Sequence, residues 1–182
     1  MSNITSTSQP GAVPQGRAAE SLEDALGEPL LPGAASGEVV IRLSDPAGMA
    51  FLAQAPSGHT LVLDTGSAHG GHGGGVEPLE LLLVALAGCT GMDVIAILRK
   101  KRQVVTDYRV RVAAIQRQAH PQVYTHIVVQ HIVSGPALDL TAVGRAVELS
   151  AYKYCPVSAM LMQACPVTHQ YRVVKTAIGA AS

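Results

Sequence analysis

Aromatic residues are scarce in this chain: of its 182 residues, five are tyrosine, one is phenylalanine and none is tryptophan. We therefore expect no stacking platform for single-stranded nucleic acid, which needs several aromatic rings. Charged residues make up only 14%, and the two signs balance to a formal net charge of +0. Without an excess of either sign there is no electrostatic attraction to nucleic acid, and we expect no nucleic-acid partner.

Cysteines are few and odd in number: Cys89, Cys155 and Cys165. Three cysteines in a chain of this length do not fit the disulfide framework of a small secreted domain. The opening stretch MSNITSTSQPGAVPQGRAAE lacks the basic and apolar segments of a secretory signal peptide. We expect a cytoplasmic protein, in which thiols are mostly reduced and cysteine chemistry is transient.

The first half of the chain divides into a polar start and a run of short strands. Residues 1–36 are rich in Ser, Gly, Pro and Ala, which predicts a flexible N-terminal tail before a single domain at 37–177. EVVIRL, MAFLAQA and HTLVLDT are β-type runs separated by turn residues, which predicts a three-stranded meander. The glycine-rich GSAHGGHGGGVEP that follows is interpreted as a mobile lid or crossover segment.

In the second half of the chain, helical patterns and strand patterns occur in separate blocks. A long helix is predicted from Pro78 to about Arg102, followed by an antiparallel hairpin formed by DYRVRVAAIQ and VYTHIVVQHIV. Asp139 is expected to cap a helix that reaches Tyr154, with a short helix at CPVSAMLMQA and a last strand at HQYRVVKT. Because strands and helices are segregated rather than alternating, the pattern favours an α+β fold.

The long helix contains LLLVALAGCTGMDVIAIL followed by RKKR, a pattern also typical of a membrane span. Asp93 argues against a membrane, since an aspartate at the centre of a bilayer costs about 2.5–3.5 kcal/mol. An apolar helix outside a membrane belongs in a core. At ~37 Å it is too long for one small domain to enclose, which favours a dimer with these helices inside.

The three cysteines have different sequence contexts. Cys89, in the middle of the apolar helix, is either a small buried hydrophobe or a reactive thiol. Cys155 precedes Pro156 and should occupy the cap of the short helix, where free backbone N–H groups and the helix dipole predict a lowered pKa. Cys165 is interpreted as a spare residue.

The histidines do not predict a metal site. His69 and His72 form an H-x-x-H pattern in the glycine-rich loop, but no cysteine or carboxylate stands at ligand spacing beside them. His126, His131 and His169 fall on strand-like runs and are interpreted as structural, His131 as a core residue. We expect no metal and no cofactor.

Two segments carry a family resemblance. PLELLLVALAGCTGMDV and YCPVS, whose cysteines are about 66 residues apart, resemble the OsmC/Ohr family of osmotically inducible and organic hydroperoxide resistance proteins. The resemblance covers about Glu38 to Lys175. It implies an α+β, intertwined homodimer in which antiparallel sheets wrap around long central helices, with two active sites at the subunit interface.

The resemblance also implies a thiol peroxidase. Cys89 would attack an organic hydroperoxide and become a sulfenic acid, Cys155 would condense with it to a disulfide, and an external dithiol would reduce the pair. Two alternatives remain: a non-catalytic dimer that binds a small ligand in an apolar pocket, and a thiol redox sensor in which Cys165 exchanges with Cys155.

One part of the family pattern is missing. Peroxidases of the family have a glutamate directly after the helix-opening proline, and this position is Leu79 here. Glu80 follows, but nine helical residues place it on the opposite side of the helix from Cys89 and ~13.5 Å away, so a first-turn acid is the alternative interpretation. The arginine that should accompany the acid is assigned to Arg42, which is otherwise a solvated strand residue.

Overall fold

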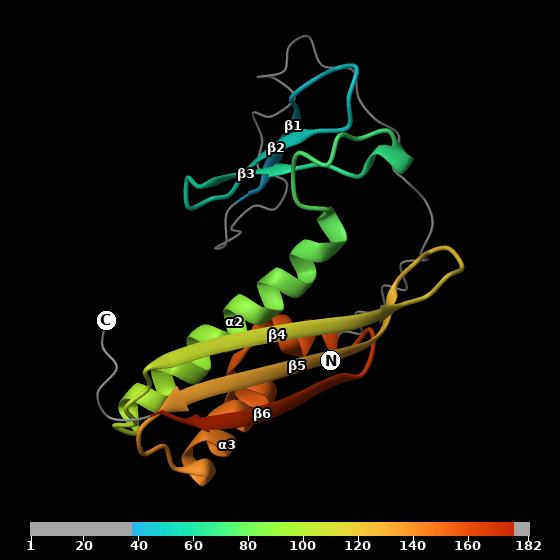
Figure 1. Cartoon of the computed structure of the whole chain (residues 1–182). Coiled ribbons are helices and arrows are strands. Elements are labelled where there is room, and N and C mark those ends of the chain that lie inside the picture. Colours follow the sequence, from blue (N-terminus) through green and yellow to red (C-terminus); the bar gives the residue numbers. More distant parts are fainter. Residues whose placement is uncertain (1–37, 177–182) are drawn as a thin grey trace, which may run out of the picture.

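A computed structural model describes residues 38–176; the tail predicted at 1–36 lies outside the described residues. The chain forms two three-stranded sheets connected by one long helix (Figure 1). The first sheet stands at the beginning of this helix, and the second sheet lies along its later turns. The α+β class predicted from the sequence is confirmed.

The first sheet is the predicted meander. Strands β1 (Val40–Leu43), β2 (Phe51–Gln54) and β3 (Thr60–Leu63) pair antiparallel in chain order. Gly58, in the turn between β2 and β3, has φ 85, a left-handed conformation that favours glycine. Turn chemistry and short apolar runs were therefore sufficient to predict this sheet.

The glycine-rich segment, interpreted from the sequence as a mobile lid or crossover, folds around one buried carboxylate. Asp64 is 3% exposed and accepts backbone N–H bonds from Thr65, His72 and Gly74 at 2.8, 3.1 and 2.9 Å. These bonds, that from Gly74 above all, lower the pKa of Asp64. The segment also forms a short 3-10 helix, η1 (Ser67–His69).

Two glycines of this segment are required by close approach. A Cβ on Gly71 would lie 2.0 Å from the carbonyl oxygen of Thr65, and one on Gly75 would lie 2.6 Å from that of Val62. The glycines thus let the segment fold back against the end of the meander instead of making it flexible.

Helix α2 (Pro78–Lys100) forms where the sequence predicts it. Pro78 opens the helix, and Glu77 and Glu80 form a reciprocal capping box across its first turn. Arg99 and Lys100 in the last turn complement the negative end of the helix dipole.

The second sheet has the order β4-β5-β6, from strands β4 (Asp107–Gln116), β5 (Tyr124–Gly135) and β6 (Val167–Lys175). The β4–β5 hairpin is antiparallel as predicted, but β6 pairs with β5 in parallel, so this sheet is mixed and not antiparallel throughout. The physical reason is that the chain returns to β6 through a helical crossover, the connection that parallel neighbours require.

The crossover contains α3 (Leu140–Leu149), a π turn η2 (Ser150–Tyr154) and α4 (Pro156–Leu161). The predicted cap is present, since Asp139 accepts a bond from the Thr141 backbone N–H at 2.8 Å. The predicted continuous helix is wrong, because the α conformation is disfavoured directly before Pro156 and the chain widens into η2.

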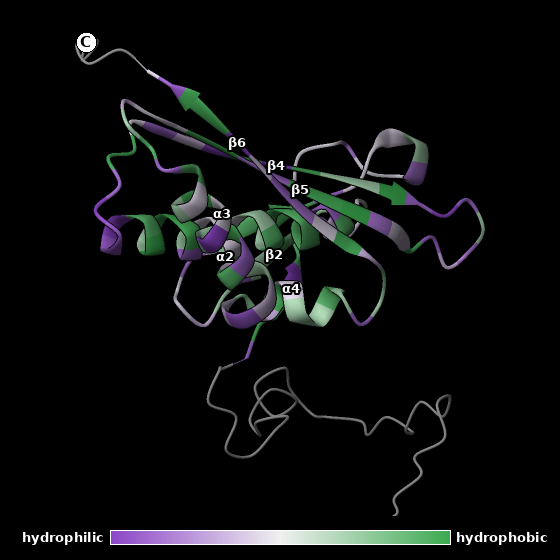
Figure 2. Cartoon of the chain, turned by 90° about the horizontal axis from the view of Figure 1, so that it is seen from below, coloured by the Kyte–Doolittle hydropathy of each residue, from purple (hydrophilic) through white to green (hydrophobic). Residues whose placement is uncertain are grey.

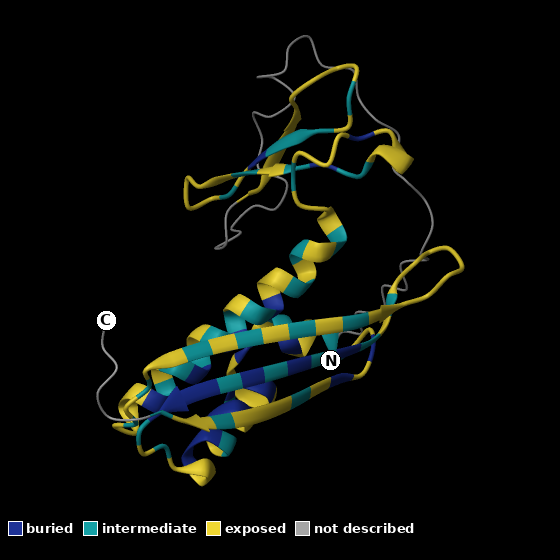
Figure 3. Cartoon of the chain, in the orientation of Figure 1, coloured by how far each residue is buried: buried dark blue, intermediate teal, exposed yellow. Residues whose placement is uncertain are grey.

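The core lies between β5 and the helices that cover one face of the second sheet (Figure 2). One cluster surrounds the middle of α2 and another surrounds its C-terminal half, as the buried residues in Figure 3 show. The first cluster consists of Leu86, Ile127, Val129, Cys155, Cys165 and Val167. The second consists of Val94, Leu98, Val133, Val143, Ala146 and Val147.

Much of α2 remains uncovered in the single chain. The helix is long and apolar enough to cross a membrane, yet only 28% of its apolar window is buried in this fold. Leu82, Val84 and Met92 are 42%, 59% and 69% exposed. The early turns of α2 and the meander therefore present apolar surface that one copy of the chain does not cover (Figure 3).

Candidate functional site

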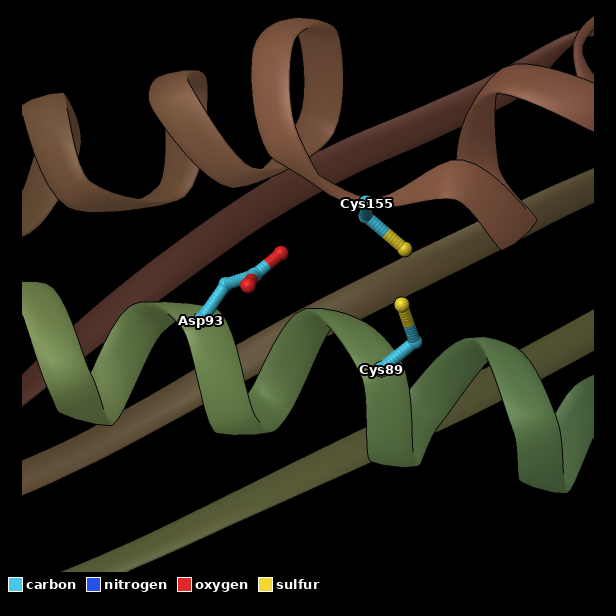
Figure 4. Close-up of side chains that lie close together, drawn as sticks. All are labelled: Cys89, Asp93 and Cys155. Atoms are coloured by element: carbon cyan, nitrogen blue, oxygen red, sulfur yellow. The ribbon is translucent and has the colours of Figure 1, made fainter. Parts of the chain in front are cut away.

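Two of the three cysteines meet beside an aspartate. Cys89 and Asp93 lie one turn apart on the same side of α2, and Cys155 faces them from the N-cap of α4 (Figure 4). The two sulfurs and a carboxylate oxygen all lie within 4.8 Å of one another. Residues 66 positions apart in the sequence (155 − 89) are thus brought together within one chain.

The cap predicted for Cys155 forms, but its predicted electrostatic effect does not. The Ser158 backbone N–H donates to the Cys155 sulfur at 3.3 Å, and Pro156 opens α4. Burial nevertheless raises the pKa of Cys155 to about 11, assisted by its hydrogen bond with Cys89. The prediction of a lowered pKa is wrong because desolvation of a residue that is 3% exposed outweighs the backbone N–H groups of Ser158 and Val157 at the start of a six-residue helix.

All three cysteines are free thiols and pack in one region of the core. Cys89 is half-buried, whereas Cys155 and Cys165 are buried. Cys89 packs against the cluster that contains both of the others. An apolar environment of this kind admits an organic molecule to the sulfur pair more readily than water.

The carboxylate of Asp93 accepts a hydrogen bond from one buried hydroxyl group, which a second buried hydroxyl contacts. Ser150 Oγ donates to Asp93 Oδ2 at 3.1 Å and lies 2.8 Å from Thr90 Oγ1. Ser150 Oγ also donates to the Thr90 backbone carbonyl oxygen at 3.3 Å, so this carbonyl and Asp93 Oδ2 share the single Ser150 hydroxyl proton. Ser150 and Thr90 are both fully buried, so the π turn that begins at Ser150 positions this network.

In the sequence analysis Asp93 served only as an argument against a membrane span, and it was not included among the site residues. Its signal was the spacing of four residues from Cys89 on one helix, which puts both side chains on the same face. Ser150 carried no such signal, because its contact with Asp93 joins residues 57 positions apart and depends on the π turn.

Behind Cys155, two histidines form a buried polar row. Tyr108 Oη lies 2.7 Å from His131 Nδ1, the His131 and His169 rings stack at 5.8 Å, and His169 Nε2 lies 3.1 Å from Ser158 Oγ. Burial and the neighbouring His169 lower the pKa of His131 to about 4, so His131 is neutral at physiological pH. The prediction that His131 is a core residue is confirmed.

The structure does not bring Glu80 or Arg42 to the sulfur pair within one chain. Glu80 Oε2 accepts the Glu77 backbone N–H at 3.2 Å in the first turn of α2, which fits its alternative interpretation as a capping acid. Arg42 is exposed on β1, in the sheet beyond the start of α2 (Figure 1). Their catalytic roles stay predictions.

An open pocket of about 560 Å³ adjoins Asp93. Its walls are mainly apolar and include two lysines at the end of α2. The lining residues are Asp93, Ala96, Ile97, Lys100, Lys101, Leu149 and Tyr154.

Known proteins are similar to this chain in sequence and in fold. The family model described as OsmC-like protein matches residues 71–170. Protein YhfA of Escherichia coli K12 is 42% identical over 127 residues, which cover 70% of this chain and 92% of that protein.

Solved structures extend the similarity. A hypothetical protein from Aquifex aeolicus VF5 is 31% identical with a TM-score of 0.67, covering 77% of this chain and 97% of its own. An organic hydroperoxide resistance protein OsmC from Legionella pneumophila is 14% identical with a TM-score of 0.56, covering 78% of this chain and 99% of its own, and shares the fold. The chain belongs to the OsmC-like family.

Proposed function

We propose that this protein is a thiol-dependent organic hydroperoxide reductase that serves oxidative-stress defence in the cytoplasm. The observation that supports it is the approach of Cys89 and Cys155 to within 4.8 Å in an apolar part of the core. A disulfide needs an S–S bond of about 2.05 Å, which side-chain rotation and a small shift of α4 against α2 would allow. The shared fold of an organic hydroperoxide resistance protein supports the same assignment.

The proposed cycle has three steps. The thiolate of Cys89 attacks the terminal peroxide oxygen, the O–O bond breaks, Cys89 becomes a sulfenic acid, and the alkoxide leaves as an alcohol after taking a proton. The Cys155 sulfur then attacks the sulfenic sulfur, which forms the disulfide and releases water. An external dithiol reduces the disulfide by exchange and is itself oxidised.

The surroundings of each sulfur suit different roles. The raised pKa of Cys155 keeps it a neutral thiol that can hydrogen bond to Cys89, as expected of a resolving group that waits for the sulfenic acid. Asp93 lies within 4.8 Å of both sulfurs. We therefore propose that its carboxylate accepts the proton that leaves Cys89 and then donates it to the alkoxide. Asp93 would take the place of the glutamate that peroxidases of the family have at the position of Leu79.

A homodimer completes this proposal. The exposed apolar residues of the meander, such as Ile41 at 50% and Val62 at 44%, and those of α2 would be buried between two intertwined copies. The meander of the second copy carries Arg42 and would be the source of a positive charge near Cys89.

The alternative of a non-catalytic ligand-binding dimer is favoured by one observation. Within one chain neither Arg42, on β1, nor Glu80, in the first turn of α2, lies beside the two sulfurs, where the peroxidases have their activating groups. In that case the pocket beside Asp93 would hold a small molecule and the cysteines would only pack.

Peroxide consumption decides between these functions. Cumene hydroperoxide is added to the full chain with dithiothreitol, and its loss is followed for the wild type and single Cys→Ser variants. We expect Cys89→Ser to abolish the reaction and Cys155→Ser to stop multiple turnover while Cys89 still forms a sulfenic acid that dimedone traps. Cys165→Ser is the matched control and should retain the wild-type rate, since Cys165 lies outside the pair.

Two results would contradict the proposal. Peroxide loss no faster than in buffer would remove the activity, and an unchanged rate in Cys89→Ser would remove the assigned nucleophile. Non-reducing peptide mapping after one equivalent of peroxide should show a Cys89–Cys155 disulfide, whereas a Cys155–Cys165 disulfide would support the redox-sensor alternative.

A further inference from the structure

The same three side chains present a metal-ligand set. Two thiol sulfurs and one carboxylate oxygen lie within 4.8 Å of one another, and they point into a common space (Figure 4). Among residues 38–176, this is the one group of three Cys, His, Asp or Glu side chains whose ligand atoms converge in this way. We propose that the reduced protein binds one Zn²⁺ ion per chain through Cys89, Asp93 and Cys155.

The geometry needs only a small contraction. Zn–S bonds of about 2.3 Å and Zn–O bonds of about 2.1 Å in a tetrahedral site place ligand atoms roughly 3.6–3.8 Å apart. The atoms here lie within 4.8 Å, so rotations about side-chain bonds close the difference of up to about 1 Å. Cys89 and Asp93 stand at i and i+4 of α2, a spacing that directs two ligands of one helix to the same ion.

Outer contacts already hold two of the ligands. The buried pair Thr90 and Ser150 directs a hydroxyl proton at Asp93 Oδ2 and leaves the other carboxylate oxygen for an ion. The Ser158 backbone N–H supports the Cys155 sulfur. Hydrogen bonds of this type orient metal ligands and change metal affinity by about 10–100-fold when removed.

The chemistry of the set selects the metal. Two thiolates favour a borderline-soft ion such as Zn²⁺ over Mg²⁺ or Ca²⁺, which prefer oxygen ligands. Binding releases the two thiol protons, and three negative ligands with Zn²⁺ leave a net charge of minus one. The adjoining pocket contains Lys100 and Lys101, which favour that charge, and three protein ligands leave the fourth position for water or a small anion.

Metal binding and peroxide reduction exclude each other at this site. A sulfur whose electron pair is shared with Zn²⁺ is a weaker nucleophile, so Zn²⁺ would reversibly inhibit the reduced enzyme. Oxidation of the two thiols to a disulfide would in turn release the ion. The metal site itself requires only the reduced side chains and does not rest on the proposed peroxidase activity.

Cobalt is the spectroscopic probe for this proposal. The reduced full chain is titrated with Co²⁺ without oxygen, and Zn²⁺ then displaces the cobalt. We expect one Co²⁺ per chain with thiolate-to-cobalt charge-transfer absorption, loss of that absorption in Cys89→Ser and Cys155→Ser, and at least about 10-fold weaker binding in Asp93→Asn and Ser150→Ala. Cys165→Ser and the double variant His69→Ala, His72→Ala are matched controls that should bind as the wild type does.

A second measurement uses only the wild-type protein, so that it does not depend on whether the variants fold. The wild-type protein oxidised to its disulfide should bind no Co²⁺, and dithiol reduction should restore binding. Absence of charge-transfer absorption in the reduced wild type, or its loss in either control variant, would overturn the proposal. Peroxide consumption by the same samples distinguishes the metal site from the peroxidase function. Zn²⁺ binding without peroxidase activity would contradict only the proposed function. Peroxidase activity without metal binding would contradict only the metal site.

Discussion

At the scale of single residues, the environment of each thiol differs from what its neighbours in the sequence suggest. Cys155 has the cap position that lowers a thiol pKa, yet it is buried in the core cluster behind α2. Burial disfavours the charged thiolate more strongly than the backbone N–H groups of Ser158 and Val157 favour it. A sequence motif therefore indicates which groups stand beside a thiol, whereas solvent access decides its protonation.

This protonation has a consequence for stability at alkaline pH. The pKa of Cys155 is about 11 in the folded protein against 9.0 for an ordinary cysteine thiol, so the unfolded chain loses its proton first as pH rises. The stabilising effect is complete below about pH 9 and disappears as pH approaches 11. We expect the Tm of the reduced wild type to fall across this range, and to fall less steeply in Cys155→Ala.

The comparison uses the slope of Tm against pH, because Cys155→Ala also changes packing at every pH. The buried Tyr108 also has a raised pKa, but it is present in both proteins and its contribution cancels. Parallel slopes for the two proteins would show that Cys155 titrates as it does in water.

At the scale of elements, the start of α2 explains the contacts of Glu80, whose role the family pattern leaves open. The capping box of Glu77 and Glu80 satisfies backbone donors at the start of α2. Glu80 also acts on Tyr124 from a distance, since burial first and then the charges of Glu80 and Glu77 raise the pKa of that tyrosine. The contacts of Glu80 in one chain are therefore those of a structural residue.

Substitution of Glu80 separates capping from catalysis. We expect Glu80→Ala to lower the free energy of unfolding by about 0.5–2 kcal/mol, as the loss of a helix cap does, and Glu80→Gln to retain most of it because an amide oxygen also accepts the bond. Peroxide reduction by the folded Glu80→Gln protein should stay within about two-fold of the wild type. A loss of ten-fold or more, about 1.4 kcal/mol, would instead establish Glu80 as a catalytic acid.

At the scale of the whole molecule, a single copy leaves two apolar regions uncovered. The meander is tied to the rest of the chain through the segment before α2, where Val76 pairs with the end of β3, and it presents residues of β1 and β3 to solvent (Figure 3). The exposed face of α2 continues this surface. An intertwined dimer accounts for both regions, and for why a helix with the length and composition of a membrane span is so little buried in one chain.

A charge on this face should prevent dimerisation. Val84 is 59% exposed on α2, and Val84→Asp would place a carboxylate where the two copies should meet. We expect light scattering after size exclusion to give twice the chain mass for the wild type and the monomer mass for Val84→Asp. Leu140→Asp is the matched control, because Leu140 is equally exposed, at 60%, but lies at the start of α3, next to Gln103 and beyond the C-terminal end of α2. A monomeric wild type, or a dimeric Val84→Asp, would contradict the dimer.

Local signals in the sequence were sufficient for most elements. Gly58 and the polar separators defined the meander, Pro78 and the basic residues bounded α2, and Asp139 marked the start of α3. These signals act over a few residues, since caps, turns and side-chain periodicity depend on the local backbone. The quoted motifs around Cys89 and Cys155 also determined the family, which the matches to known proteins show.

Tertiary structure decided everything that depends on contacts between distant segments. The parallel pairing of β6, the fold of residues 65–76 around Asp64, and the link from Ser150 to Asp93 have no local signature. The raised pKa of Cys155 likewise arises from burial among residues of other elements. Local sequence specifies the backbone because its energies are short-ranged, whereas solvent exclusion and long-range pairing exist only after the chain has folded.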